Sequence, residues 1–225
     1  MGDKVVAVTG GFGALGRAVV RHLADQNFQA VAVDLGASGQ VDRAALELGG
    51  VDAADPEAAE AAIASILHRF GRLDGLINIA GGFGWQTLAD GALDTWDSLY
   101  RSNVRTAVAM SRAAIAHLPR PGGAIVNVGA AAAAKAGAGM GAYTAAKSGV
   151  ARLTEALADE LKDSGIRVNA VLPSIIDTPT NRADMPDAEF GRWVSPLSLA
   201  RVIGFLISED AESITGALIP VTGRV

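Results

Sequence analysis

The fold is decided by the stretch Lys4-Val5-Val6-Ala7-Val8-Thr9-Gly10-Gly11-Phe12-Gly13-Ala14-Leu15-Gly16. Its first six residues are mostly apolar and β-branched, which predicts a buried strand, and residues 14–25 have the pattern of a helix. Glycines at this junction let the backbone turn sharply and approach a pyrophosphate group, whose charge is stabilised at the helix N-terminus. The turn therefore predicts a dinucleotide site, the alternative being a tight turn that binds nothing. Its candidate residues are Gly10, Phe12, Gly13, Ala14, Leu15 and Gly16.

The same alternation of apolar strands and Ala-rich helices continues along the chain. Further strands are predicted at 30–33, 50–52, 73–79, 124–128, 166–172 and 217–221, and further helices at 56–70, 94–118, 141–162 and 197–208. Apolar strands that are each followed by a helix indicate a parallel sheet covered on both faces. We therefore predict an α/β fold, a single-domain Rossmann-type doubly wound parallel sheet of about seven strands, with its ligand crevice at the carboxyl ends of the strands.

Two finer features are also predicted. Asp94 or Thr95 is expected to cap the long helix at 94–118, which is interrupted on the way. The whole chain, 1–225, is expected to be one dinucleotide-binding domain, because no linker or repeat divides it. Its least regular segment, 174–195, is expected to be a substrate loop.

The composition narrows the function classes. The 225 residues carry a net charge of -5, which gives no basic surface for nucleic acid and no attraction to anionic lipid. Cysteine is absent and the three histidines lack metal-ligand spacing, so neither thiol catalysis nor a metal site is expected. No uninterrupted apolar stretch would cross a bilayer, and a strand is predicted almost at the N-terminus with no targeting segment before it. We expect a cytoplasmic enzyme that acts on a small molecule.

Acidic residues follow two of the predicted strands. Asp34 ends the second strand about twenty residues beyond the glycine turn, where a carboxylate accepts both ribose hydroxyls and repels a 2′-phosphate. Residues 35–38 supply no basic side chain for such a phosphate, and neither do Gly11 and Phe12. NAD(H) is therefore the expected cofactor and NADP(H) the less favoured one, the alternative for Asp34 being a plain turn residue. Asp52 is a candidate contact of the adenine or, equally, a helix-entry residue.

Tyr143 and Lys147 are four residues apart in the predicted helix 141–162, so both side chains lie on one helix face. A phenol ordinarily titrates with a pKa of ~10, and a neighbouring ammonium favours its ionised form. The pair is therefore a candidate general acid/base, although the same spacing also occurs on solvated helix faces.

With these residues in place, the chain resembles the short-chain dehydrogenase/reductase family over essentially its whole length. The matching motifs are the turn 9–16, Asn78-Ile79-Ala80-Gly81, Asn103, the Tyr143/Lys147 pair, and Pro173 through Thr178. The resemblance implies that Tyr143 donates the proton, that Lys147 holds the nicotinamide ribose and lowers the tyrosine pKa, and that Asn103 anchors a relay water. The nicotinamide itself supplies the redox chemistry. The further cofactor contacts that the resemblance implies are Asn78, Ala80, Gly81, Lys147, Pro173, Ile176 and Thr178.

One departure from the family pattern bears on the substrate. Thirteen residues before Tyr143 the family normally has a serine that hydrogen-bonds the substrate carbonyl, but this chain has Ala130, and residues 129–142 contain no serine or threonine. Losing one such donor typically costs a carbonyl reaction about 3 kcal/mol. The dihydropteridine reductase branch also lacks the serine, and this chain is similar to it in the turn 10–16, in residues 80–83 and 139–143, and above all in residues 177–193.

Three functions remain open at this stage. The first is an NADH-dependent reductase of a planar conjugated acceptor such as a quinonoid dihydropterin, which needs little carbonyl polarisation and so tolerates Ala130. Phe83, Trp85 and Trp193 would flank the ring near the nicotinamide, the equal alternative being that they only pack within the protein. The second is an ordinary NAD(P)-dependent alcohol dehydrogenase or ketone reductase, for 3-oxoacyl or similar substrates, in which Asn103, Thr144 or a backbone amide replaces the serine. The third is a dinucleotide-binding protein without catalytic activity.

The family resemblance also implies a homodimer or homotetramer. Its contacts are expected to come from the helices near 98–118 and 141–162, where small residues such as Ala107 and Ala151 permit close helix approach. The alternative is that these alanines pack on the sheet of their own subunit.

Overall fold

A parallel sheet of seven strands forms the centre of the protein in the computed structural model, which describes residues 4–225. The strands are β1 (Val5–Thr9), β2 (Gln29–Val33), β3 (Leu46–Leu48), β4 (Gly75–Asn78), β5 (Ala124–Val128), β6 (Arg167–Pro173) and β7 (Leu218–Val221). Their order across the sheet is β3-β2-β1-β4-β5-β6-β7, with every neighbouring pair parallel. The predicted single-domain, doubly wound fold is confirmed.

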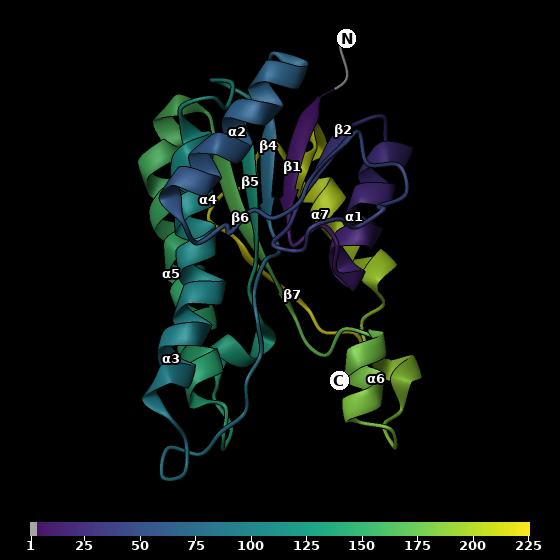
Figure 1. Cartoon of the computed structure of the whole chain (residues 1–225), viewed down its shortest axis with the longest axis vertical. Helices are drawn as coiled ribbons and strands as arrows, with labels where there is room; N and C mark the ends of the chain where they lie inside the picture. The colour runs from purple at the N-terminus through teal and green to yellow at the C-terminus, as the bar shows by residue number, and fades with distance from the viewer. Residues whose placement is uncertain (1–3) are drawn as a thin grey trace.

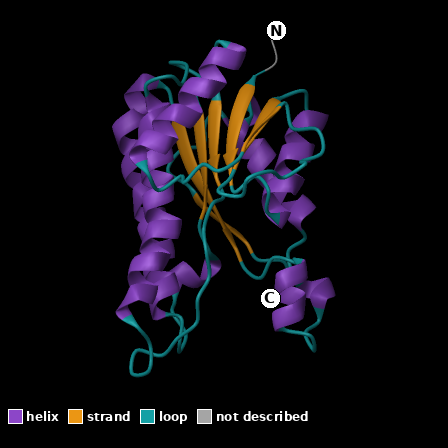
Figure 2. Ribbon diagram, in the orientation of Figure 1, coloured by secondary structure: helices purple, strands orange, loops and turns teal. Residues whose placement is uncertain are grey.

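Helices cover both faces of this sheet (Figures 1 and 2). On one face, α1 (Ala14–Asp25) and α7 (Pro196–Ile207) pack around a core that includes Val19, Leu199 and Ile203. On the other face, α2 (Pro56–Phe70), α4 (Thr106–Ile115) and α5 (Gly141–Leu161) bury Met110 and Ile125 among others. Because both faces are covered, β1, β4 and β5 are buried along their whole length, which explains their mostly apolar sequences.

Two predicted boundaries are wrong. The third strand lies at Leu46–Leu48 and not at 50–52, because Gly50, with φ of 72°, ends the extended backbone before those residues. The helix α3 (Leu93–Tyr100) starts after Ala92, so neither Asp94 nor Thr95 is its N-cap. The expected interruption of the longer helix is present as a π-helical turn at Arg101–Arg105, between α3 and α4.

The segment 174–195 is more regular than its sequence indicates. It contains α6 (Pro179–Asp184), which begins where the Thr178 hydroxyl accepts the Asn181 N–H and Pro179 occupies the first turn. The ribbon places α6 beyond the end of the sheet (Figure 1). No helix within residues 4–225 is long and apolar enough to cross a membrane.

Candidate active site

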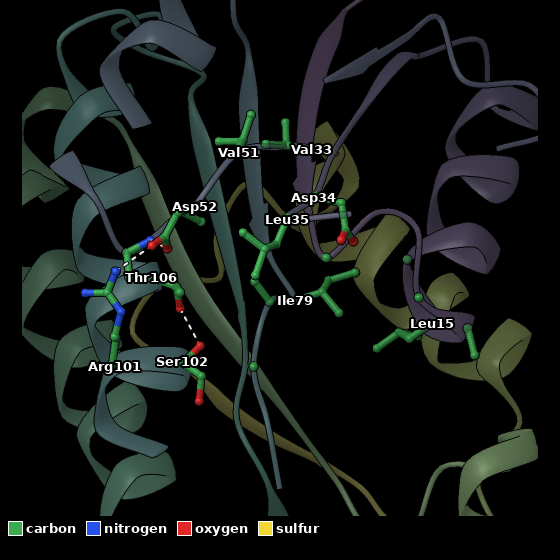
Figure 3. A pocket seen from close by; sticks show the side chains of 18 of the residues that line it. Leu15, Val33, Asp34, Leu35, Val51, Asp52, Ile79, Arg101, Ser102 and Thr106 are labelled. Atoms are coloured by element: carbon green, nitrogen blue, oxygen red, sulfur yellow. Dashed lines mark hydrogen bonds and ion pairs between the residues drawn. The ribbon is translucent and has the colours of Figure 1, made fainter. Parts of the chain in front are cut away.

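A cavity of about 640 Å³ lies at the carboxyl ends of β1, β2 and β4. Figure 3 shows Leu15 and Asp34 on one side of it and Asp52, Arg101 and Ser102 on the other. Of the predicted cofactor residues, those in its lining are Gly10, Gly13, Ala14, Leu15, Gly16, Asp34, Asp52, Ala80, Gly81 and Thr178. The crevice predicted at the sheet edge is therefore present as a cavity, and about half of its lining residues are ones assigned to the dinucleotide.

The glycine turn is packed so tightly that side chains would block it. Gly10 has φ of 67°, and a Cβ on it would lie 2.9 Å from the Ala80 nitrogen. A Cβ on Gly16 would lie 2.1 Å from the Gly10 carbonyl oxygen, so the helix α1 can approach the turn only with glycine at this position. No side chain caps the N-terminus of α1 at Gly13, which leaves that helix end to an anion from outside the chain. The turn fits a pyrophosphate.

Asp34 is held in place by backbone donors. Its Oδ2 accepts the Phe12 N–H at 3.0 Å and its Oδ1 accepts the Gly36 N–H at 3.0 Å. Phe12 itself is not in the cavity lining, so its contribution is this backbone contact. A carboxylate fixed at the end of β2 suits ribose hydroxyls and opposes a 2′-phosphate.

Arg17 is a basic residue close to this carboxylate that the sequence reasoning left out. Its Nε donates to the Phe12 carbonyl at 2.8 Å, and its other nitrogens donate to the carbonyls of Gly39 at 2.5 Å and Gln40 at 3.3 Å. The guanidinium therefore links the loop after β2 to the glycine turn, because its nitrogens donate to backbone carbonyls of both segments.

The N-cap of α2 is Asp55, whose side chain accepts the Glu57 N–H, so Asp52 does not cap that helix. Asp52 lines the cavity instead. Its Oδ1 accepts the Ala54 N–H at 2.9 Å near the entry to α2, and its Oδ2 forms an ion pair with Arg101 at 2.5 Å across the cavity wall (Figure 3). Sequence reasoning missed Arg101 as a lining residue. The signal was its position two residues before Asn103, on the same helical stretch. The other lining residues that it missed include Ser98, Ser102, Thr106 and Thr180.

Tyr143 and Lys147 lie on α5 as predicted, and both are largely withdrawn from water. Lys147 is 6% exposed, and its Nζ donates to the Val128 carbonyl at 2.9 Å. Burial lowers the pKa of Lys147 to about 8 and raises the pKa of Tyr143 to about 12. The expectation that the ammonium lowers the tyrosine pKa is not met in the protein alone, because desolvation of the phenol dominates. The phenol is therefore protonated at neutral pH.

Asn103 lies on the π-helical turn, and its side chain and that of Lys147 both lie next to Gly81. Its Nδ2 donates to the carbonyls of Leu99 at 2.9 Å and Gly82 at 3.0 Å, and its Oδ1 accepts the Gly82 N–H at 3.3 Å. A Cβ on Gly81 would lie 2.5 Å from Asn103 Oδ1 and 3.3 Å from Lys147 Nζ. The structure thus brings Gly81, Asn103 and Lys147 together beside the cavity, just beyond the carboxyl end of β4.

Asn78, in contrast, points its amide into the protein core. Its Nδ2 donates to Ser111 Oγ at 3.1 Å and to Asn127 Oδ1 at 2.9 Å, and Asn127 in turn donates to Thr154 Oγ1 at 2.9 Å. This buried chain of polar side chains joins β4 and β5 to α4 and α5. Asn78 is absent from the cavity lining, and its role in the site is to fix the strand that carries Ala80 and Gly81.

The remaining predicted cofactor contacts lie at the end of β6 or just beyond it. Thr178 lines the cavity, and its hydroxyl accepts the Asn181 N–H at 3.2 Å. The Ile176 carbonyl accepts Asn181 Nδ2 at 2.8 Å, and Pro173 is the last residue of β6. Neither Ile176 nor Pro173 lines the cavity.

The four candidate substrate residues divide into two groups. Phe83, 64% exposed, lies edge-on to the Tyr143 ring with centroids 5.0 Å apart, and Trp85, 61% exposed, donates to the Ala138 carbonyl in the turn before α5. Ala130 is 5% exposed and lies two residues beyond β5. Trp193 lies elsewhere, 8% exposed and packed on Phe190 at 4.9 Å, so its contacts are those of a core residue.

The groups expected to replace the missing serine already have partners. The Thr144 hydroxyl donates to the Met140 carbonyl at 2.8 Å, one helical turn earlier. The Asn103 amide donates to Leu99 and Gly82. Both side chains that were expected to replace the family serine therefore donate to backbone carbonyls of their own chain.

Comparison with known proteins decides the family. Residues 4–189 match the short chain dehydrogenase family. The chain belongs to this family. It is 31% identical to a meso-2,3-butanediol dehydrogenase of Serratia marcescens, over 98% of this chain and 94% of that protein. It is 31% identical to a 3-oxoacyl-(acyl-carrier-protein) reductase of Pseudomonas aeruginosa, over 98% of this chain and 96% of that protein.

Solved structures agree with this assignment. A short chain dehydrogenase from Burkholderia cenocepacia, in complex with NADP, superposes with a TM-score of 0.90 at 31% identity, covering 99% of this chain and 97% of that one. This short-chain dehydrogenase is accordingly an NAD(P)-dependent oxidoreductase, and the expectation of an enzyme is confirmed. The names of these relatives do not single out the dihydropteridine reductase branch.

Proposed function

We propose that this short-chain dehydrogenase interconverts a carbonyl compound and its alcohol, with Tyr143 as the proton donor in the direction of reduction. The observation that carries the proposal is that Lys147, one helical turn after Tyr143 on α5, lies with Asn103 beside Gly81, which lines the cavity. The named activities of the relatives, on butanediol and on 3-oxoacyl groups, support an alcohol/carbonyl pair.

The cofactor proposed for the cavity is NAD(H). When bound, the nicotinamide supplies the hydride. The turn at 10–16 would hold the pyrophosphate, Asp34 a ribose, Lys147 the nicotinamide ribose, and the Thr178 region the carboxamide. The fixed Asp34 carboxylate supports NAD(H) over NADP(H), and the NADP in the Burkholderia structure makes the preference a point to measure.

The proton is held at Tyr143 Oη. With a pKa of about 12 the phenol keeps its proton at neutral pH, as a donor to a developing alkoxide must. Lys147, one helical turn away, favours the phenolate once the proton has left, because a buried ammonium stabilises a nearby negative charge strongly.

A second candidate is favoured by one specific observation. Ala130 offers no hydrogen bond to a substrate oxygen, and the side chains that were expected to replace a serine there are committed elsewhere. An acceptor that is already electrophilic, such as a quinonoid dihydropterin, needs no such donor. Phe83 beside Tyr143 would suit a planar ring. We therefore keep reduction of a planar conjugated acceptor as the second proposal.

A substrate panel separates these proposals. Initial rates of NADH oxidation are measured with acetoin, cyclohexanone, a 3-oxoacyl thioester and a quinonoid dimethyldihydropterin. Efficient turnover of the first three, with the pterin at background, supports the alcohol/carbonyl proposal and removes the second. The reverse pattern promotes the second. If NADH binds but no compound is turned over, both substrate proposals are wrong.

A homo-oligomer remains a proposal that rests on the family resemblance. The alanines expected at the interface, Ala107 and Ala151 among them, are buried within the single chain, so they pack on neighbouring elements of their own subunit. The exposed side chains Leu93, Tyr100 and Val108 on α3 and α4 are the better candidates for contacts. Sedimentation velocity at micromolar concentration tests the proposal, and a monomer there would remove it.

A further inference from the structure

The segment that follows β4 is fastened to the turn that leads into α5. Trp85 Nε1 donates to the Ala138 carbonyl at 3.0 Å, and the Gln86 N–H donates to the Gly139 carbonyl at 2.9 Å. Successive residues of one segment therefore bind successive carbonyls of the other. The turn ends at Gly141, where α5 begins, two residues before Tyr143.

The absence of a side chain at Gly139 leaves the space that the Trp85 ring occupies. The Gly139 φ of 74° is disfavoured for other residues, and a Cβ on this glycine would lie 2.1 Å from the Trp85 ring. Trp85 is nonetheless 61% exposed, so the ring is held on this glycine at the protein surface and not in the core. The position of the ring is therefore fixed by its contacts with residues 138–139 and not by burial.

The same segment is anchored on its other side as well. Gly82 exchanges two hydrogen bonds with the Asn103 side chain, at 3.0 and 3.3 Å. Farther along, the Gln86 side chain closes the loop 86–92 by binding both the N–H and the carbonyl of Ala92, at 3.1 and 3.0 Å. Phe83 thus lies between two anchors, one at Asn103 and one at the turn 138–139. It is the residue that contacts the Tyr143 ring, at 5.0 Å and an interplanar angle of 72°.

We infer that Trp85 is a positioning residue that locks the segment 83–86 onto the turn 138–139 and so holds Phe83 against Tyr143 as a fixed wall of the substrate site. The wall offers aromatic surface beside the proton donor, which selects substrates with a flat or apolar group next to the reacting carbon. The inference rests on the proposed function for the role of Tyr143. It goes beyond that function by assigning the wall and the residue that fixes it.

The test compares Trp85→Ala with a matched control, Leu88→Ala, which removes an exposed apolar side chain from the same loop. In full-length protein, Trp85→Ala should lower kcat/KM by up to about 10²-fold for the best substrate of the panel, since loss of fixed geometry near the chemistry has effects of this size. The KM for that substrate should rise while the KM for NADH stays within about twofold, because Trp85 lies outside the dinucleotide cavity. Leu88→Ala should behave as wild type.

Conservative and paired variants sharpen the test. Trp85→Phe keeps a ring on Gly139 but loses the hydrogen bond to Ala138, and should cost no more than about tenfold. Gly139→Ala should resemble Trp85→Ala, since its methyl group would collide with the ring. Combined with Trp85→Ala it should add only the strain of its positive φ, because the ring it would strike is gone.

A readout without turnover keeps the inference separate from the proposed function. Amide hydrogen exchange at Gln86 should speed up in Trp85→Ala and not in Leu88→Ala, whether or not any panel compound is a substrate. Unchanged exchange at Gln86, or equal kinetics of the two variants, would overturn the inference. Faster exchange in an enzyme that reduces no panel compound would refute the proposed function alone.

Discussion

Restoring the missing hydroxyl with Ala130→Ser is the perturbation that discriminates best between the two proposed substrates. Ala130 is almost fully buried two residues beyond β5, so the new hydroxyl would be desolvated in the free enzyme. A buried hydroxyl without a partner costs about 1–3 kcal/mol, which sets the expected loss of folding stability. A hydroxyl that binds a developing oxyanion is worth about 10²–10³ in rate, which sets the expected gain on a substrate that needs it.

These magnitudes predict opposite outcomes for the two substrate classes. If the natural acceptor is already electrophilic, Ala130→Ser should leave its reduction within a few-fold of wild type, because only interactions that strengthen in the transition state raise the rate. The same variant should gain up to about 10²–10³ on cyclohexanone. If the natural substrate is an ordinary ketone, wild type should already reduce it well, and the variant should gain little.

The assay measures kcat/KM for cyclohexanone and for a quinonoid dimethyldihydropterin in wild type, Ala130→Ser and the control Ala132→Ser. The control places a hydroxyl two residues away, on the short helical turn Ala131–Ala134. A ketone gain in both serine variants would refute the reasoning, because the effect would not depend on the position of the family serine. No gain in Ala130→Ser, combined with poor wild-type ketone reduction, would refute it as well.

Further predictions concern the cofactor and the catalytic pair. Asp34→Ala should narrow the preference for NADH over NADPH by at least about tenfold in fluorescence titrations, and equal wild-type affinities would refute the assignment. Tyr143→Phe should lower kcat by about 10²–10⁴ and leave NADH affinity unchanged, whereas Lys147→Ala should harm both. In urea melts without cofactor, the contribution of Lys147 to the free energy of unfolding should rise by roughly 2 kcal/mol between about pH 7.5 and 9.5. The sign follows because the folded protein, with a Lys147 pKa of about 8, releases a proton that the unfolded chain, with a pKa of 10.5, still binds. Lys147→Met should lack this rise, and an equal rise in the variant would show that Lys147 is not its source.

The architecture was predictable because its signals are local. Each central strand is apolar throughout and each is followed by a helical pattern, and a parallel sheet is the arrangement that buries both. The third strand escaped prediction because Leu46–Leu48 is only half-buried at the sheet edge, where the apolar signal is weak. The start of α3 at Leu93 was missed for a related reason, since its N-cap Ala92 makes no side-chain contact that a sequence motif would reveal.

The cavity lining was predictable where a residue follows the carboxyl end of a strand. Gly10, Asp34 and Gly81 follow strand ends, and all three line the cavity. Trp193 and Arg101 show the limit of such reasoning. Nothing in the sequence says that Trp193 packs on Phe190, or that Arg101 pairs with Asp52 from an element 49 residues away. The Arg101–Asp52 ion pair depends on the packing of elements distant in the chain, and the burial of Trp193, three residues from Phe190, depends on how their short helical turn packs on the rest of the protein.

Burial of the catalytic pair has opposite consequences for folding and for catalysis. Lowering the pKa of Lys147 from 10.5 to about 8 corresponds to roughly 3 kcal/mol of destabilisation at neutral pH, where the buried ammonium stays charged. Within the described chain its Nζ has one acceptor, the Val128 carbonyl, although an ammonium has three donors. The remaining donors suit ribose hydroxyls and a phenolate, which are the groups that the proposed reaction brings to Lys147. The buried Lys147 ammonium thus destabilises the folded protein without cofactor, and it would be stabilised once the ribose and the phenolate are present. This is expected of a side chain kept for function.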